Sequence, residues 1–194
     1  MEQNRFTEAI EKIDALNRGD PNKELHEDRK EAKELLYSFR MTYWLMKVSP
    51  NASEALRLAA RAQHLCRWEI LRDEYPMDRA GYLKWRTTLK ILHANKAVGI
   101  LESCGYDNEL IEKVESLILK KKIKTDVEAQ TLEDVACLVF LKYHLSNFIT
   151  KHDPKKIISI IQKTWGKMSD LGHKYALKIE YSEPANKLIK QALA

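Results

Sequence analysis

The chain has 194 residues, of which 44% are apolar and 31% are charged, and it holds only 6 glycines and 5 prolines. This composition excludes a collagen-like or low-complexity chain and argues against long disordered segments, because enough apolar side chains are present to form a core. The formal net charge of +5 is mildly basic and by itself indicates little beyond solubility. The longest apolar run, residues 135–141, is far shorter than the roughly 20 residues that a membrane-spanning helix needs. We therefore expect no membrane partner.

The first residues and the cysteines favour a cytoplasmic protein. Residues 1–5 have no apolar stretch behind a basic start, so no secretory signal is expected. Cys66, Cys104 and Cys137 are odd in number, far apart and set among apolar residues. They are expected to be reduced core residues and not disulfides or a zinc cluster. The length predicts a single domain over residues 1–194.

Apolar residues recur every three or four positions through the first half of the chain, which predicts helices. The first expected helix lies near residues 6–16, and a charged stretch over residues 22–33 precedes a second helix over residues 35–48. Ser49-Pro50 has the form of an N-cap followed by a proline in the first turn. A third helix is therefore expected to run to about Arg72.

Aspartates in helix-starting positions divide the second half of the chain. Asp78, Asp107 and Asp153 can each cap a helix, and Gly105 supplies a stop for the helix before Asp107. The expected helices are residues 79–104, 108–119, about 126–149 and 154–168, with a short terminal helix after residue 184. No alternating run flanked by hairpin turns is present. The sequence therefore predicts an all-α protein, a single compact bundle of seven or eight helices.

The arginines are unevenly distributed. All ten lie between Arg5 and Arg86, whereas residues 87–194 contain lysine and no arginine. Arginine is favoured where a planar guanidinium must bind a carboxylate or a phosphate. The distribution predicts a clamp for an anionic ligand, with buried Arg–Glu pairs as the alternative. The side chains expected to bind such a substrate are Arg40, Arg61, Arg67 and Arg86, with Trp68 beside them.

The densest basic run, Lys120-Lys121-Lys122-Ile123-Lys124, follows an amphipathic segment. It complements the C-terminal end of a helix dipole. We prefer this interpretation to a nucleic-acid patch, because no aromatic residues are interleaved with the lysines.

Two histidines lie within apolar helices. The spacing of Arg61, His64 and Trp68 places them on one face of the third expected helix. His93 lies on the long helix that follows, among apolar neighbours. Each could be a hydrogen-bonded core histidine or a metal ligand.

A carboxylate pair, Glu133-Asp134, leads directly into the most apolar segment of the chain. Helix capping is one reason for such a pair, and metal or substrate binding is the other. Together, His64, His93 and Asp134 form a nitrogen and oxygen donor set that suits a divalent transition metal such as Mn, Fe, Zn or Co. In that arrangement Glu133 would orient or deprotonate a water molecule.

At these residues the sequence resembles a known family, the domain of unknown function 4202. The resemblance extends over nearly the whole chain and has no activity attached to it. It is carried by segments that include Ala59-Ala60-Arg61-Ala62-Gln63-His64, Gly81-Tyr82-x-x-Trp85-Arg86, His93-Ala94 and Leu132-Glu133-Asp134-Val135-Ala136-Cys137.

A more distant resemblance is to the HD-domain metal phosphohydrolases, which are helical bundles. Leu58-Ala59-Ala60-x-x-x-His64 is similar to their Leu-Ala-Ala-x-x-His-Asp helix within one residue of spacing, although Leu65 stands where the Asp should be. This resemblance implies an HD-like bundle with His64, His93 and Asp134 as metal ligands.

The function expected from these features is metal-dependent hydrolysis of a small phosphorylated or otherwise anionic substrate, a nucleotide being one candidate. The alternative is a binding module without catalysis, in which the same arginines hold an anionic ligand or RNA. A plain scaffold, whose arginines form buried ion pairs, is the third interpretation.

Overall fold

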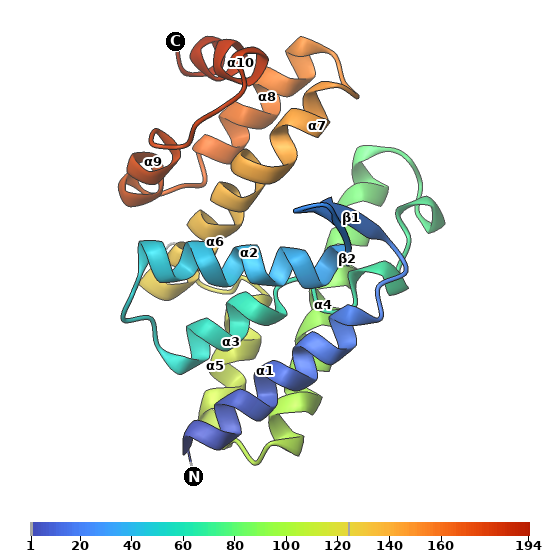
Figure 1. The fold of residues 1–194 in the computed structure, drawn as a ribbon, viewed down its shortest axis with the longest axis vertical. Helices are drawn as coiled ribbons and strands as arrows, with labels where there is room; N and C mark the ends of the chain where they lie inside the picture. Colours follow the sequence, from blue (N-terminus) through green and yellow to red (C-terminus); the bar gives the residue numbers. More distant parts are fainter. Residues whose placement is uncertain (1, 124) are drawn as a thin grey trace.

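Most of the described chain is helical, which confirms the predicted fold class. The computed structural model describes residues 2–123 and 125–194, so Lys124 of the basic run lies outside the described residues. The α-helices are α1 (Glu2–Arg18), α2 (Lys33–Val48), α3 (Glu54–Ala62), α4 (Arg79–Ser103), α5 (Asn108–Ile118), α6 (Val127–Val139), α7 (Leu145–Ile149), α8 (Pro154–Trp165), α9 (Asp170–Ala176) and α10 (Glu183–Leu193) (Figure 1). Two 3₁₀ turns, Arg67–Glu69 and Arg72–Glu74, precede α4, and a π-helical turn, Phe140–His144, joins α6 to α7.

The helix starts follow the capping residues that the sequence offers. The side chains of Asp78, Asp107 and Asp153 accept hydrogen bonds from backbone N–H groups in the first turns of α4, α5 and α8. Gly105 follows α4 with a φ of 73°, a left-handed conformation that glycine adopts without a steric penalty. These four predicted boundaries are confirmed.

The core runs continuously through the described chain, from Ala9 on α1 to Ala192 on α10. Helix α2 packs against α1, α3 and α6, and α5 packs against α3 and α4. Figure 1 shows α7, α8 and α10 grouped at the C-terminal end, joined to the rest through α6. No helix in the described ranges is long and apolar enough to cross a membrane.

A two-stranded antiparallel hairpin, β1 (Lys23–His26) and β2 (Arg29–Ala32), departs from the expected helices and loops. Its turn residues Glu27 and Asp28 both have positive φ. The strands are polar and mostly exposed, so they carry none of the apolar alternation that marks a half-buried strand.

The third expected helix is much shorter than predicted. Ser53, and not Ser49, caps α3, and the helix ends at Ala62 instead of running to about Arg72. Its end is followed by a turn in which Cys66 has a left-handed backbone with a φ of 56°. Arg61, His64 and Trp68 therefore do not share one helix face. This break creates the site described next.

Candidate anion-binding and acid–base site

A small pocket lies where the segment after α3 meets α4 and the end of α5. It has a volume of about 240 Å³, its open mouth included. Seven of its eight lining side chains are histidines, cations or amides. The lining residues are Gln63, His64, Arg67, Arg86, Leu89, Lys90, His93 and Lys120.

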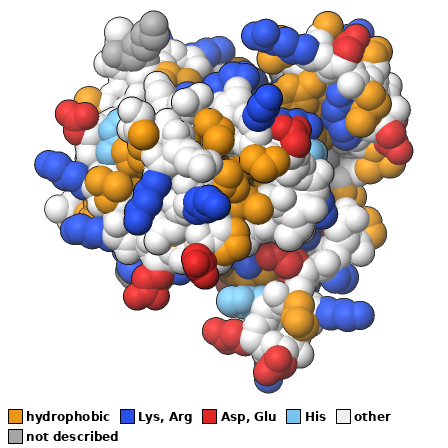
Figure 2. All heavy atoms as spheres, turned by 90° about the horizontal axis from the view of Figure 1, so that it is seen from above, with side chains coloured by type: hydrophobic (Ala, Val, Ile, Leu, Met, Phe, Trp, Pro, Cys, Tyr) orange, Lys and Arg blue, Asp and Glu red, His pale blue; other side chains and the backbone are white. Residues whose placement is uncertain are grey.

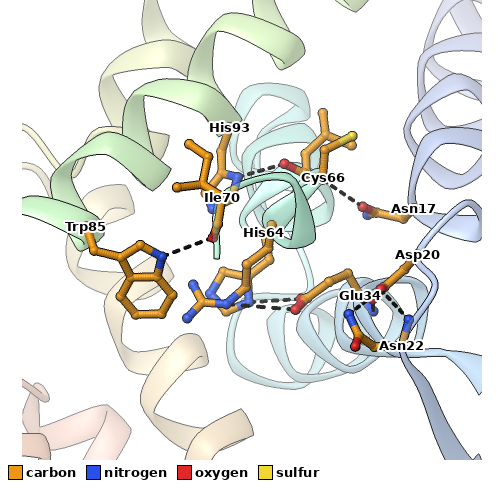
Figure 3. Close-up of polar contacts among 11 residues, drawn as sticks. Asn17, Asp20, Asn22, Glu34, His64, Cys66, Ile70, Trp85 and His93 are labelled. Carbon is orange, nitrogen blue, oxygen red and sulfur yellow. Dashed lines mark hydrogen bonds and ion pairs between the residues drawn. The ribbon is translucent and has the colours of Figure 1, made fainter. Parts of the chain in front are cut away.

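The turn after α3 positions two of these side chains. The left-handed Cys66 reverses the chain between His64 and Arg67, and its backbone N–H donates to the side-chain oxygen of Asn17 at 3.2 Å. A non-glycine residue in this conformation costs about 1 kcal/mol or more, so it is retained where the surroundings require it. The reversal brings both His64 and Arg67 to one carboxylate, Glu34 on α2, and Figure 3 shows His64 beside Glu34.

Glu34 is buried at the base of this arrangement. Its Oε2 lies 3.2 Å from Nδ1 of His64, and its Oε1 lies 3.8 Å from Nε of Arg67. The carboxylate of Asp20 accepts a hydrogen bond from the backbone N–H of Glu34 at 3.0 Å, which fixes the start of α2. The ring of Tyr37 stacks on His64 with centroids 3.8 Å apart and planes 10° from parallel. Glu34 thus holds the edge of the His64 ring, and Tyr37 holds its face.

His93 reaches the same pocket from α4. Its Nδ1 lies 2.7 Å from the carbonyl oxygen of Leu65, and only a protonated Nδ1 can donate to that oxygen. The rings of His64 and His93 have centroids 5.8 Å apart. Donation from Nδ1 to Leu65 leaves Nε2 of His93 unprotonated, and donation from Nδ1 of His64 to an ionised Glu34 would leave Nε2 of His64 unprotonated as well.

Burial keeps both imidazoles neutral. Burial, followed by the charges of Arg67 and Arg86, holds the pKa of His64 well below its ordinary value of 6.5. Burial and the neighbouring His64 lower the pKa of His93 to about 3. Burial also raises the pKa of Glu34, an effect that Arg67 opposes. Two neutral imidazoles beside a carboxylate are suited to accept protons or to bind a metal ion.

Four cations surround the histidines. Burial lowers the pKa of Arg67 and of Lys90, and in both cases positive neighbours add to the effect: Arg86 for Arg67, and Lys120 with Arg86 for Lys90. These side chains therefore repel one another in a partly dry pocket. The pocket is electrostatically prepared for an anion.

Glu133, expected to act on water, is paired with lysines at the edge of the pocket. Its carboxylate binds Lys120 and lies 3.7 Å from Lys167. Burial alone would raise the pKa of Glu133, but the two lysines and Arg86 lower it overall. A carboxylate stabilised in this way is a weak base, and it positions Lys120.

Asp134 serves the packing of α9. Its Oδ1 accepts hydrogen bonds from the backbone N–H of Ser169 at 2.8 Å and from the Gln130 side chain at 3.0 Å, and its Oδ2 binds the Ser169 hydroxyl. The structure therefore brings His64 and His93 together but commits Asp134 to the start of α9. In the described ranges, no group of three or more His, Cys, Asp or Glu side chains is placed to hold a metal ion.

Gly172 permits the close approach of the Asp134 side chain to α9, so its replacement should disturb the packing there. A Cβ at Gly172 would lie 2.8 Å from Cγ of Asp134, so Gly172→Ala should destabilise the protein by about 1–3 kcal/mol through overpacking. Gly99, on an exposed part of α4 with nothing within 4 Å of its Cβ position, is the control. Gly99→Ala should stabilise by about 0.5–1 kcal/mol, because alanine is the better helix former. Thermal unfolding of both variants checks the pair, and an unchanged melting temperature for Gly172→Ala would contradict this role of Asp134.

The predicted substrate-binding residues divide into two groups. Arg67 and Arg86 line the pocket. Arg61 instead binds Asp14 through two hydrogen bonds of 2.6 and 2.7 Å, and Arg40 pairs with Glu24 at 2.7 Å and covers the ring of Tyr143. Trp68 packs on the core. Buried ion pairs, the alternative interpretation of the arginines, thus account for Arg40 and Arg61.

Several residues of the site carried little or no signal in the sequence. The helical spacing in the sequence does not connect Glu34, Tyr37, Lys90 and Lys120 in a shared pocket. His144 is the last residue of the π-helical turn, and its ring centroid lies 6.2 Å from that of Tyr37. Such turns often occur at functional sites, but their one-residue insertion is invisible to helical periodicity.

Comparison with known families matches residues 7–189 to a domain of unknown function, DUF4202. No curated protein and no solved structure matches the chain. The comparisons thus support the first resemblance and offer none to the HD-domain enzymes. Since the match covers nearly the whole sequence, the chain belongs to the DUF4202 family.

Proposed function

We propose that this protein binds a small phosphorylated molecule in the pocket and hydrolyses its phosphoester bond. The observation that carries the proposal is the convergence of Arg67, Arg86, Lys90 and Lys120 on two neutral histidines. Guanidinium and ammonium groups recognise phosphate oxygens, and a neutral imidazole held by a carboxylate is a common general base.

The charge of the pocket fits a phosphate monoester. The four cations face two carboxylates, Glu34 and Glu133, so at least two positive charges have no carboxylate partner within the described pocket. A phosphate monoester carries about −1.5 to −2 charges near neutral pH. Its binding would relieve the repulsion that lowers the pKa of Arg67 and Lys90.

The proposed reaction uses His64 as the base. A water oxygen attacks phosphorus, and Nε2 of His64 accepts the water proton while Glu34 stabilises the imidazolium that forms. The bond between phosphorus and the ester oxygen breaks, and the leaving oxygen takes a proton from solvent. The four cations stabilise the charge on the phosphoryl oxygens in the transition state.

A divalent metal ion could still bind in the pocket, with His64 and His93 as its ligands but without Asp134. His64 and His93 each hold Nδ1 against an oxygen acceptor, which is the usual support of a metal-bound imidazole. Of the predicted donors, these two fit Mn, Fe, Zn or Co through Nε2, and the phosphate and water would have to complete the coordination. A metal held by Nε2 of His64 would take the place of His64 as the base, because that nitrogen has a single lone pair, and it would instead lower the pKa of its bound water. A bound metal would polarise the phosphoryl oxygen.

A small ligand is favoured over RNA. The pocket is small, and on the face seen in Figure 2 the lysines and arginines are scattered among acidic and apolar side chains. A binding module without catalysis is the remaining alternative, and it shares the pocket and the cations.

Inorganic phosphate and a panel of phosphomonoesters test the proposal. We expect the wild type to bind phosphate by calorimetry and to release it from at least one ester, in EDTA or with added Mn²⁺. Arg86→Ala should weaken phosphate binding about tenfold, a typical loss for one charge-assisted contact. Arg79→Ala, which removes the same charge from an exposed position on α4, should leave it unchanged.

Three other results of these measurements would change the proposed function. Binding without release from any ester, in EDTA or with metal, would leave the binding module. Absence of phosphate binding would overturn the proposal. Tight binding of RNA whose affinity falls steeply with salt, without phosphate binding, would favour the RNA alternative.

A further inference from the structure

The phosphate pocket borders an aromatic surface on α4 that the hydrolysis itself does not use. Tyr82 is 43% exposed, and its ring centroid lies 6.0 Å from that of Trp85. We call Tyr82 and Trp85 the aromatic shelf.

Two pocket cations connect the shelf to the pocket. Arg86 lines the pocket, and its Nη1 donates a hydrogen bond of 3.2 Å to the hydroxyl of Tyr82. Arg67 also lines the pocket, and its guanidinium carbon lies 4.7 Å from the centroid of Trp85. A phosphate held by both arginines would therefore lie one side chain away from each ring.

The shelf is held in place before any ligand binds. The indole N–H of Trp85 donates to the carbonyl of Ile70 at 3.0 Å (Figure 3). Arg72 donates to the carbonyls of Tyr75 and Pro76, each at 2.9 Å. Gly81 lets α4 start directly against Pro76, since a Cβ there would lie 2.1 Å from the Pro76 carbonyl oxygen. A fixed aromatic surface binds a planar group at a low entropic cost.

We propose that the natural substrate carries a planar aromatic or heteroaromatic group joined to its phosphate, and that this group lies on the aromatic shelf. Sugars and simple alcohols gain little from such a surface, whereas a flat ring gains stacking with Tyr82 and cation–π contact with the neighbouring guanidinium groups. This inference rests on the proposed function, because it assumes a phosphate in the pocket.

Calorimetric binding of methyl phosphate and phenyl phosphate tests the inference, since the two esters share the phosphate and differ in the ring. The wild type should bind phenyl phosphate about tenfold more tightly, a typical contribution of one stacked ring. Tyr82→Ala should remove this difference between the two esters. The ratio of the two affinities is the readout, because loss of the hydrogen bond to Arg86 changes the affinity for both esters alike. Tyr82→Phe, which keeps the ring and loses only the hydrogen bond to Arg86, should retain the difference. Tyr43→Ala is the control, because Tyr43 is also half-exposed but lies on α2.

The outcomes separate the inference from the proposed function. Equal affinity of the wild type for both esters, or an unchanged preference in Tyr82→Ala, would overturn the aromatic shelf and leave the phosphate pocket standing. Failure of both esters to bind would overturn the two proposals together. A nucleoside monophosphate that binds more tightly than phenyl phosphate, with the gain lost in Tyr82→Ala, would support a heteroaromatic substrate.

Discussion

Replacing His64 with asparagine should lower kcat for phenyl phosphate by about 10²–10⁴-fold, the range lost when a general base is removed. The affinity for inorganic phosphate should change little, because the four cations remain in place. The measurement is steady-state phosphate release beside calorimetric phosphate binding. His26→Asn is the control, since His26 lies exposed on the hairpin. A variant that is fully active would exclude His64 as the base, and loss of phosphate affinity alone would assign it to binding.

The pH dependence of the wild type gives the same test without a mutation. A general base acts only when unprotonated, so kcat/KM falls as the pH drops through the pKa of the free enzyme's base. Burial and the charges of Arg67 and Arg86 hold the pKa of His64 well below 6.5. The acid limb should therefore lie well below pH 6.5, with activity flat through neutrality. An acid limb centred at 6.5 or above would show that the base is a different or a solvated group.

Glu34→Gln should produce a smaller loss of kcat than His64→Asn. A glutamine can still accept from Nδ1 of His64, but it removes the negative charge that stabilises the imidazolium. The same variant should strengthen phosphate binding, because it removes a negative charge 3.8 Å from Arg67. Opposite changes in turnover and affinity would distinguish this role from a general loss of structure.

Arg61→Ala should mainly lower the stability of the protein, whereas Arg67→Ala should mainly weaken phosphate binding. Arg61 and Asp14 form a nearly buried pair, with side chains 9% and 14% exposed. Breaking such a pair leaves an uncompensated buried charge and costs about 3–5 kcal/mol, so the melting temperature should fall by roughly 10 °C. Phosphate affinity, measured where the variant is still folded, should be unchanged.

Arg67→Ala should lower the melting temperature less than Arg61→Ala does and weaken phosphate binding at least tenfold. Arg67 is repelled by Arg86, is 25% exposed and lies 3.8 Å from its carboxylate partner, Glu34, so its ion pair is weaker than the 2.6 Å pair of Arg61. Differential scanning fluorimetry and calorimetry on the two variants provide the comparison. If Arg67→Ala unfolds while Arg61→Ala and the wild type both bind phosphate normally, Arg67 would be a structural ion pair, as the scaffold interpretation requires.

Local rules in the sequence determined the fold class and most helix boundaries. Asp78, Asp107 and Asp153 satisfy backbone N–H groups within three residues, and Gly105 ends α4 through its own backbone freedom. Each of these effects depends on the nearest few residues, so the sequence carries them directly. The sequence also drew attention to His64 and His93, because polar residues within apolar helices need an explanation.

The composition of the site depended on contacts that sequence spacing does not encode. Helical periodicity placed Arg61 beside His64, but the left-handed Cys66 and the bond to Asn17 reverse the chain after α3. That reversal turns His64 and Arg67 towards Glu34, while Arg61 stays with Asp14. Because helical periodicity does not predict this reversal, the sequence could not show that Arg67 faces the pocket and Arg61 the core.

The carboxylates show the same division. Glu133 and Asp134 stand next to each other in the sequence, yet one binds Lys120 at the pocket and the other binds Ser169 at the start of α9. Neighbouring residues on a helix point about 100° apart, so adjacency in the chain says little about which partner each will meet. The sequence by itself determined the helices and that polar groups lie among them. Only the packing of α2, α4 and the ends of α3 and α5 decided which of those groups share a pocket, because ion pairs and hydrogen bonds form between residues that the fold brings together from distant parts of the chain.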